Sequence, residues 1–254
     1  MAKPEGMNSG PYNTPMALHR EPFSAGFWVL CAPFLIPVFG SAIISLVWPG
    51  YFDVIRDPSA NAEAIGQVWL SLAAIQLAYF AILSVWSERI GAGAFAGDMK
   101  ASQNWILAAI LLGPVILIGP NLIAASLFAA EDGWQYSGDV NEALFAPQNW
   151  GPSYLVYAMI LAPIVEEVTY RGIAMGAMLV RGVPPLMTMV LSSAAFTFIH
   201  LQYSVPALIV VFIASMGFAW LRLKSGTVIV PILAHVSANG LITFLASLAP
   251  PPAG

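Results

Sequence analysis

The stretch SYLVYAMILAPIVEEVTYRGIAMGAML, residues 153–179, is an apolar run that carries three charged side chains near its middle. It is long enough to cross a membrane, since a transmembrane helix needs about 20 largely apolar residues. The charged side chains belong to Glu166, Glu167 and Arg171. A charge at the centre of a bilayer costs about 2.5 to 3.5 kcal/mol on insertion scales. The run therefore predicts a transmembrane helix whose charges have partners or a function.

The composition of the whole chain supports a membrane location. Of its 254 residues, 59% are hydrophobic and 9% are charged, and the mean hydropathy is +0.78. A soluble domain usually carries about 25% charged residues, so this chain lacks the polar residues to cover a water-facing surface. The sequence contains no basic patch with interleaved aromatic residues. We therefore expect an integral membrane protein that has the lipid bilayer as a partner and no nucleic acid.

Seven apolar runs meet the length requirement for a transmembrane helix. They lie near 25–48, 65–86, 104–128, 153–179, 185–203, 205–222 and 227–248. Their apolar residues are continuous rather than alternating, which excludes the strands of a membrane barrel. The predicted fold is all-α, a polytopic membrane helix bundle of about seven transmembrane helices that occupies residues 25–254.

The first 24 residues differ from the rest because they are polar and rich in proline and glycine. They lack the apolar core and the small-residue cleavage site of a signal peptide. We interpret residues 1–24 as a flexible cytoplasmic tail, in which His19 is a solvated side chain.

The basic residues predict how the bundle is oriented. Those before the first run, or in loops on the same side of the bundle, are Lys3, Arg20, Arg89, Lys100, Arg181, Arg222 and Lys224. The opposite side has only Arg56 together with an acidic stretch over 131–150. Basic loops stay on the cytoplasmic side. This pattern places the N-terminus in the cytoplasm and the C-terminus outside the cell inner (plasma) membrane.

The three charges of the fourth run are not equivalent. On a helix Glu167 and Arg171 are four residues apart with the acid first, the favourable orientation for an ion pair. Glu166 projects about 100° away around the helix and gains no partner from this run. An intramembrane acid without a partner is a functional candidate by default.

Three further polar side chains lie in later apolar runs. His200 belongs to the fifth run, and His235 and Asn239 project from one face of the seventh. Such residues often only link neighbouring helices, at about 0.6 kcal/mol each. Together with the glutamates they also have the chemistry for peptide hydrolysis, because a carboxylate and an imidazole activate water. A histidine and an amide can then donate to the oxyanion.

Within the fifth run, Ser192 and Ser193 are interpreted as small packing residues rather than nucleophiles.

The pattern of these motifs resembles a known family. Glu-Glu-x-x-x-Arg at 166–171, Phe-x-x-x-His at 196–200 and His-x-x-x-Asn at 235–239 are similar to the three motifs of the CAAX-prenyl protease and bacteriocin-processing (CPBP, or Abi) family. The resemblance covers about residues 150–245 and implies an intramembrane endopeptidase.

The resemblance also implies a role for each motif residue. Glu166 would activate water with the help of His200, and Glu167 with Arg171 would hold the site. His235 and Asn239 would form the oxyanion hole. The substrate would be a membrane-tethered or lipidated peptide or protein.

Metal dependence stays open at the level of the sequence, because members of the family have been described both as metalloproteases and as metal-independent glutamate proteases. Glu166, His200 and His235 are residues that would supply ligands to a divalent metal such as zinc. The sequence has no His-Glu-x-x-His helix. We favour a glutamate-activated water and no obligatory metal cofactor.

The depth of His200 is the weak point of this assignment. From a rise of 1.5 Å per residue, Glu166 and His235 lie inside their runs, whereas His200 comes out roughly 10 Å too close to the outer surface. We therefore predict that the turn QYSVP at 202–206 is buried within the bundle, which is allowed where protein or a water-filled cavity satisfies the backbone.

Two smaller signals surround the glutamates. Pro163 predicts an opening of the helix just before them. Gly172 and Gly176 form a GxxxG pattern, which suits either close packing within the bundle or a dimer face.

Two other functional interpretations fit parts of the sequence. One is a non-catalytic membrane scaffold or subunit that keeps the family fold and associates with another membrane protein. The other is a transporter that uses the buried acids, although the sequence shows no inverted repeat and no paired broken helices.

Overall fold

The computed structural model of the chain describes residues 12–57, 64–92, 100–128 and 151–248. Within these ranges the regular secondary structure is helical, as predicted. In chain order the elements are η1 (Met16–Arg20), α1 (Pro22–Leu30), α2 (Ala32–Val47), α3 (Tyr51–Arg56), α4 (Ile65–Arg89), α5 (Gln103–Phe128), α7 (Pro152–Tyr154), η4 (Leu155–Leu161), α8 (Ala162–Glu167), η5 (Val168–Ala174), α9 (Met175–Leu179), α10 (Pro185–Phe198), α11 (Val205–Ser225) and α12 (Ile229–Ser247).

Residues 152–179 form one continuous helix, which we call the glutamate helix. The residues at its internal junctions, Leu155, Ala162, Val168 and Met175, all have right-handed helical dihedral angles. Its segments η4 and η5 are π-helical, so each backbone N–H reaches back five residues instead of four. Such wide turns are rare and are found frequently at functional sites. The sequence predicted the helix and one opening at Pro163, but not these two turns.

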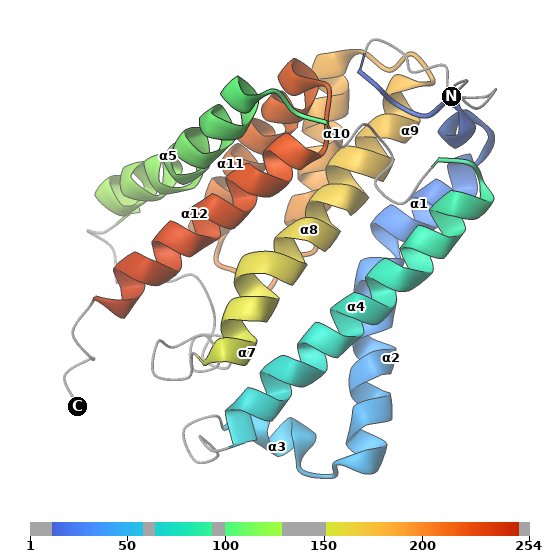
Figure 1. Ribbon diagram of the computed structural model, residues 1–254. Helices are drawn as coiled ribbons and strands as arrows, with labels where there is room; N and C mark the ends of the chain where they lie inside the picture. Colours follow the sequence, from blue (N-terminus) through green and yellow to red (C-terminus); the bar gives the residue numbers. More distant parts are fainter. Residues whose placement is uncertain (1–11, 58–63, 93–99, 129–150, 249–254) are drawn as a thin grey trace.

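The helices form two groups with the glutamate helix between them (Figure 1). On one side α5 packs against α11 and α12, and α10 packs against α11. On the other side α4 packs against α2 and α3 and also contacts the first half of the glutamate helix. This arrangement gives the charged side chains of the glutamate helix neighbours from both halves of the chain.

Large apolar side chains cover much of the outer surface of the bundle. Phe23, Leu46 and Val47 are 93%, 81% and 83% exposed, and many other leucine, isoleucine, valine and phenylalanine side chains are also exposed. A soluble monomer rarely exposes contiguous apolar surface of this extent. The surface is suited to the hydrocarbon of a bilayer, which confirms an all-α membrane bundle.

The predicted number of seven transmembrane helices is not confirmed. In the described residues, α4, α5 and α11 are long and apolar enough to cross a membrane. The pair α1 and α2 makes a fourth span if the two are counted together across their 54° bend. The bend adjoins Pro33, whose ring lacks the N–H that would continue the helical hydrogen bonds. Helix α10 is shorter than its apolar run because it ends at Phe198, before His200.

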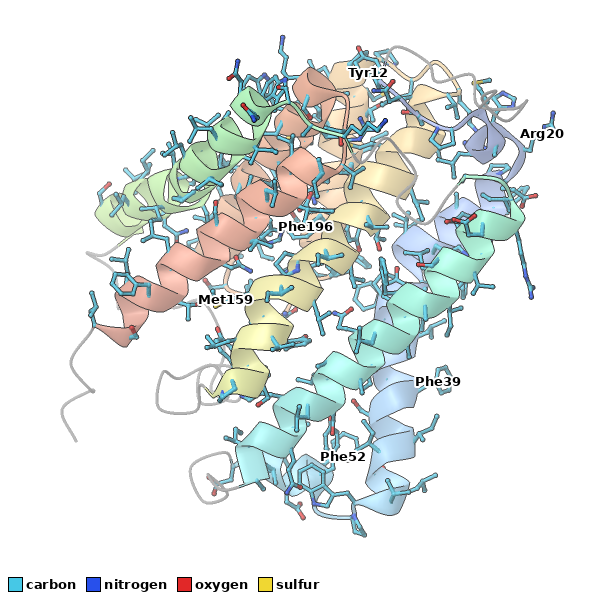
Figure 2. All side chains as sticks on the ribbon, viewed as in Figure 1. Tyr12, Arg20, Phe39, Phe52, Met159 and Phe196 are labelled. Atoms are coloured by element: carbon cyan, nitrogen blue, oxygen red, sulfur yellow. The ribbon has the colours of Figure 1, made fainter. Side chains whose placement is uncertain are left out.

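The last part of the predicted flexible tail is packed against the bundle, which differs from the expectation. Residues 16–20 form η1, where Leu18 is fully buried, and Thr14 just before it is also buried. Figure 2 shows Tyr12 and Arg20 at the end of the bundle where α9 ends. Residues 1–11 of the predicted tail lie outside the described ranges.

Candidate active site

Glu167 and Arg171 form the predicted ion pair in the centre of the bundle. Arg171 Nη1 lies 3.1 Å from Glu167 Oε1, and neither side chain is exposed. Arg171 Nη2 also donates to α11, to the Ser215 hydroxyl at 2.7 Å and the Ser215 carbonyl at 3.0 Å. Because an unpaired buried charge is costly, the pair and its anchor on α11 explain how the helix tolerates both charges.

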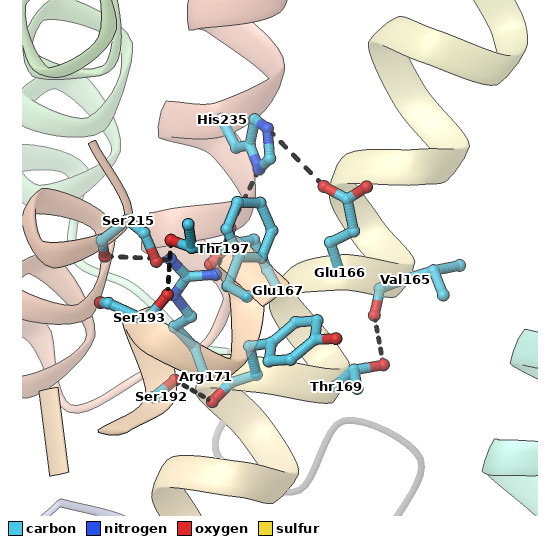
Figure 3. Close-up of polar contacts among 12 residues, drawn as sticks. Val165, Glu166, Glu167, Thr169, Arg171, Ser192, Ser193, Thr197, Ser215 and His235 are labelled. Atoms are coloured by element: carbon cyan, nitrogen blue, oxygen red, sulfur yellow. Dashed lines mark hydrogen bonds and ion pairs between the residues drawn. The ribbon is translucent and has the colours of Figure 1, made fainter. Parts of the chain in front are cut away.

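His235 connects the two glutamates (Figure 3). Its Nδ1 is 2.9 Å from Glu167 Oε1, and its Nε2 is 3.9 Å from Glu166 Oε2. The sequence placed Glu166 without a partner in its own helix, and its partner in the structure indeed comes from a different helix, α12. Glu166 is also the more accessible glutamate, since its side chain is 19% exposed whereas that of Glu167 is fully buried.

Phe196, the first residue of the second motif, is the common neighbour of the polar groups. Its ring centroid lies 4.8 Å from the Arg171 guanidinium carbon, 4.8 Å from the His200 ring and 6.2 Å from the His235 ring. The labelled ring is in the interior of the bundle in Figure 2. A cation over an aromatic face is attracted by the ring quadrupole, so Phe196 stabilises Arg171 while its ring also contacts both histidines.

His200 lies in the turn that follows α10 rather than within a helix. Its Nδ1 is 2.9 Å from the Phe196 carbonyl, and its ring contacts Tyr203 at 5.4 Å between centroids. In this turn Gln202 is exposed, and Tyr203 and Ser204 are half-buried. The turn is therefore only partly covered by protein, and its burial within a membrane stays a prediction.

Asn239 satisfies a carbonyl that Pro163 leaves without a backbone donor. In η4 the N–H of Ala162 bonds to Tyr157, and Pro163 has no N–H to offer. The carbonyl of Ala158 thus accepts neither an α-helical hydrogen bond from Ala162 nor a π-helical one from Pro163. The Asn239 side-chain Nδ2 donates to it at 2.9 Å instead. One of the two amide hydrogens of Asn239 is engaged in this way, and the other has no acceptor among the residues that the structure describes.

The second π-helical segment is held from outside as well. From outside, the Ser192 hydroxyl of α10 donates to the Tyr170 carbonyl at 2.9 Å. Within the glutamate helix, Thr169 Oγ1 donates to the Val165 carbonyl at 2.7 Å. The packing role predicted for Ser192 is thus accompanied by a hydrogen bond. Ser215 and Ser192 were not singled out as supporting residues, because a lone serine in an apolar run is not distinctive.

A comparison with family models identifies the segment that carries these residues. Residues 148–241 match the Type II CAAX prenyl endopeptidase Rce1-like family. We call residues 148–241 the Rce1-like segment, after the family that they match. It contains all six predicted site residues: Glu166, Glu167, Arg171, His200, His235 and Asn239. The match agrees with the family resemblance seen in the motifs. Together with the apolar helices it supports a multi-pass membrane protein, one segment of which is similar to a protease family.

Two further comparisons contribute nothing to the assignment, since neither the curated proteins nor the solved structures gave a significant match.

A small cavity adjoins Glu166 on the side of the Rce1-like segment that faces α2 and α4. Its volume is about 50 Å³, and its polar lining comes from Glu166, Gln76, Tyr79 and Thr169. A water needs roughly 10 to 15 Å³ of such volume and two to four polar partners. The cavity therefore has the size and the polar groups to hold a few waters next to the accessible glutamate.

The side chains that would supply metal ligands are not gathered into a ligand set. Among the described residues, no group of three or more histidine, cysteine, aspartate or glutamate side chains is arranged to hold a metal ion. Glu167 Oε1 is already shared by Arg171 and His235. Whether Glu166, His200 and His235 bind a divalent metal stays a prediction.

Proposed function

We propose that the chain is an intramembrane endopeptidase that cleaves a peptide bond in a membrane-associated protein or peptide, with a water activated by Glu166. The observation that carries this proposal is the position of Glu166. It is the accessible carboxylate of the buried cluster and it lines a water-sized cavity. The Rce1-like match supports the same class of reaction.

In the proposed reaction Glu166 takes a proton from water as the oxygen attacks the carbonyl carbon of the substrate. The bond between that carbon and the amide nitrogen then breaks, and Glu166 returns the proton to the departing amine. No covalent intermediate with the protein is required.

His200 would assist as a second proton acceptor. Its Nδ1–H donates to the Phe196 carbonyl, which fixes the neutral tautomer with a lone pair on Nε2. The role depends on Nε2 reaching the attacking water in the complex with substrate.

His235 and Asn239 would stabilise the oxyanion. Donation of Nδ1–H to Glu167 leaves Nε2 of His235 directed towards Glu166. If His235 carries hydrogen on both ring nitrogens, Nε2 donates to the oxyanion. Glu166 has by then taken the proton from water, so Arg171 and His235 balance Glu167 and the oxyanion. The second amide hydrogen of Asn239 would add another donor, and one such donor is worth about 3 to 4 kcal/mol of transition-state stabilisation.

Glu167 and Arg171 act as positioning residues in this proposal. They fix the ring of His235 and are themselves too buried to meet the substrate.

The substrate, the orientation and metal independence are also proposals. We propose a membrane-tethered or lipidated peptide as substrate, and a cell inner membrane location with the N-terminus in the cytoplasm and the C-terminus outside. We further propose that no metal is obligatory.

The test uses the purified full-length protein and a panel of membrane-tethered peptides. Wild type is compared with Glu166→Ala and His200→Ala, and with the matched controls Glu88→Ala and His19→Ala, which change exposed residues of the same types. Loss of cleavage in the first pair but not in the controls, with folding retained, is the expected result. A chelator added to the same assay should leave the rate unchanged. Equal behaviour of all five proteins with every substrate would instead favour a non-catalytic membrane subunit.

A further inference from the structure

Arg222 is a fully buried cation whose contacts are unusual for a charged residue. Its Nη1 donates to the Tyr12 carbonyl at 2.9 Å, and its Nε donates to the Arg171 carbonyl at 3.3 Å. Its Nη2 is buried without a hydrogen-bond partner in the described part of the chain, where no carboxylate pairs with it either. Burying a charge without an acidic partner is costly. Packing alone therefore does not explain the position of Arg222.

At the π-helical turn the Arg171 carbonyl accepts a hydrogen bond from outside its own helix. In a regular α-helix this carbonyl would accept from the N–H of Met175. In η5 that N–H is directed to Tyr170 and Gly172 instead. Arg222 supplies a donor from α11, two turns beyond Ser215, which holds the side chain of the same arginine. Helix α11 therefore fixes both the main chain and the side chain of Arg171.

The other end of Arg222 is tied to the N-terminal segment, residues 12–20. This segment packs on the glutamate helix at Gly176, and we call this contact surface its seat. A Cβ at Gly176 would lie 2.8 Å from Leu18 Cδ1 and 3.0 Å from Thr14 Cγ2, so the two side chains pack directly on this glycine and a larger residue would have to displace them. Arg181 Nη2 also donates to the carbonyls of Leu18 and His19, at 2.6 Å and 2.8 Å. Within one chain, Gly176 of the GxxxG pattern thus serves close packing of the N-terminal segment.

The geometry points to Arg222 as a positioning residue that couples the docked N-terminal segment to the candidate active site. The docked segment fixes Arg222, which fixes the main chain of Arg171. Arg171 holds Glu167, and Glu167 holds His235. This inference rests on the proposed function for its kinetic consequence but not for the docking itself. Release of the segment removes none of the substrate-contacting residues. It makes the positions of Glu167 and His235 less well fixed.

The first experiment releases the segment from its seat in the full-length protein. Leu18→Asp places a charge in the buried seat, and Gly176→Leu fills it. Met16→Asp is the matched control, because Met16 lies in the same short helix but is 42% exposed. Limited trypsin digestion after Arg20 reports release of the segment, and cleavage of a membrane-tethered peptide reports kcat and KM. Thermal unfolding confirms that each variant remains folded.

Leu18→Asp and Gly176→Leu should both accelerate trypsin cleavage after Arg20 and lower kcat on the order of ten- to a hundredfold, with little change in KM. Met16→Asp should match wild type in all three measurements. If Leu18→Asp releases the segment while kcat stays at the wild-type value, the coupling is wrong.

The second experiment changes the coupling residue itself. Arg222→Met removes both hydrogen bonds, whereas Arg222→Lys keeps the charge but cannot span two carbonyls with a planar fork. The methionine variant should accelerate trypsin cleavage after Arg20 and lower kcat, and the lysine variant should lie between it and wild type. If wild type cleaves no substrate, the proposed function fails, but trypsin still tests the docking. Protection of Arg20 in Arg222→Met equal to that in wild type would overturn the inference.

Discussion

Helix α4 and the glutamate helix lie side by side and are similar in length, yet they differ in where their charges lie and in their backbone hydrogen bonding. Helix α4 is a regular α-helix over Ile65–Arg89, and its charged residues, Glu88 and Arg89, are confined to its C-terminal end. The glutamate helix carries three charges near its middle and changes to a π-helical turn twice. The difference shows what an intramembrane charge demands from the surrounding protein.

The carbonyls explain why the two helices differ. In α4 the serine at position 71 bonds to a carbonyl of its own helix, that of Gln67. In the glutamate helix, carbonyls at the wide turns receive donors from three other helices, through Asn239, Ser192 and Arg222. A helix can leave the α register in a bilayer only where neighbouring groups satisfy its backbone. The polar support therefore permits the geometry that presents Glu166 and Glu167 to His235.

The largest stability difference between the two helices should come from Arg171→Met. Removing one partner of a buried ion pair leaves an uncompensated charge, which typically costs about 3 to 5 kcal/mol. Ser71→Ala in α4 should change the free energy of unfolding by less than about 0.5 kcal/mol. Reversible unfolding in mixed micelles measures both.

The double variant Glu167→Gln with Arg171→Met sharpens this prediction. It should be more stable than Arg171→Met alone, because no unpaired charge remains. A double variant that is at least as unstable as the sum of the two single variants would contradict the role of the pair.

A smaller loss of stability is expected from changes at the π-helical turn η4, which precedes the glutamates. Asn239→Ala should destabilise the protein by about 1 to 3 kcal/mol, because the half-buried Ala158 carbonyl loses its donor. Pro163→Ala restores a backbone N–H that the π register directs to this carbonyl. The combination of Pro163→Ala with Asn239→Ala should therefore recover part of the loss. Strict additivity of the two changes in a double-mutant cycle would show that they do not share the carbonyl.

The smallest effect concerns the contact between the two helices. The Tyr79 hydroxyl of α4 donates to the Trp28 carbonyl at 2.8 Å and lies 3.2 Å from Thr169 Oγ1 of the glutamate helix. Tyr79→Phe removes one neutral hydrogen-bonding group and should cost about 1 kcal/mol. The free energy of unfolding tests this directly, and a loss as large as that of Arg171→Met would mean that α4 shares the strict polar requirements of its neighbour.

The sequence predicted those parts of the molecule that depend on local spacing. The helical class follows from the apolar runs, and the pairing of Glu167 with Arg171 follows from their separation of four residues. The contact of His235 with Glu167 could not be predicted, because it depends on how α12 packs against α8. The family motifs identified the residues but not these contacts.

The wide turns and the docked segment were beyond sequence reasoning for other physical reasons. A π-helical turn leaves the same apolar pattern as an α-helix, so periodicity does not reveal it. The N-terminal segment is polar in composition, and only the seat at Gly176 shows that Leu18 is buried there. The turn at His200 was recognised as a depth conflict, and the early end of α10 at Phe198 accounts for part of it.

The most direct test of the central claim compares two glutamates in the neighbouring helices. Glu166→Gln and Glu88→Gln each remove one carboxylate with almost no change in shape, and cleavage of a membrane-tethered peptide is measured for both. If Glu166 activates water, Glu166→Gln should lower kcat by about 10² to 10⁴-fold, as expected for the loss of a general base, while Glu88→Gln keeps the wild-type rate. A folded Glu166→Gln variant that cleaves the peptide as fast as wild type would contradict the account.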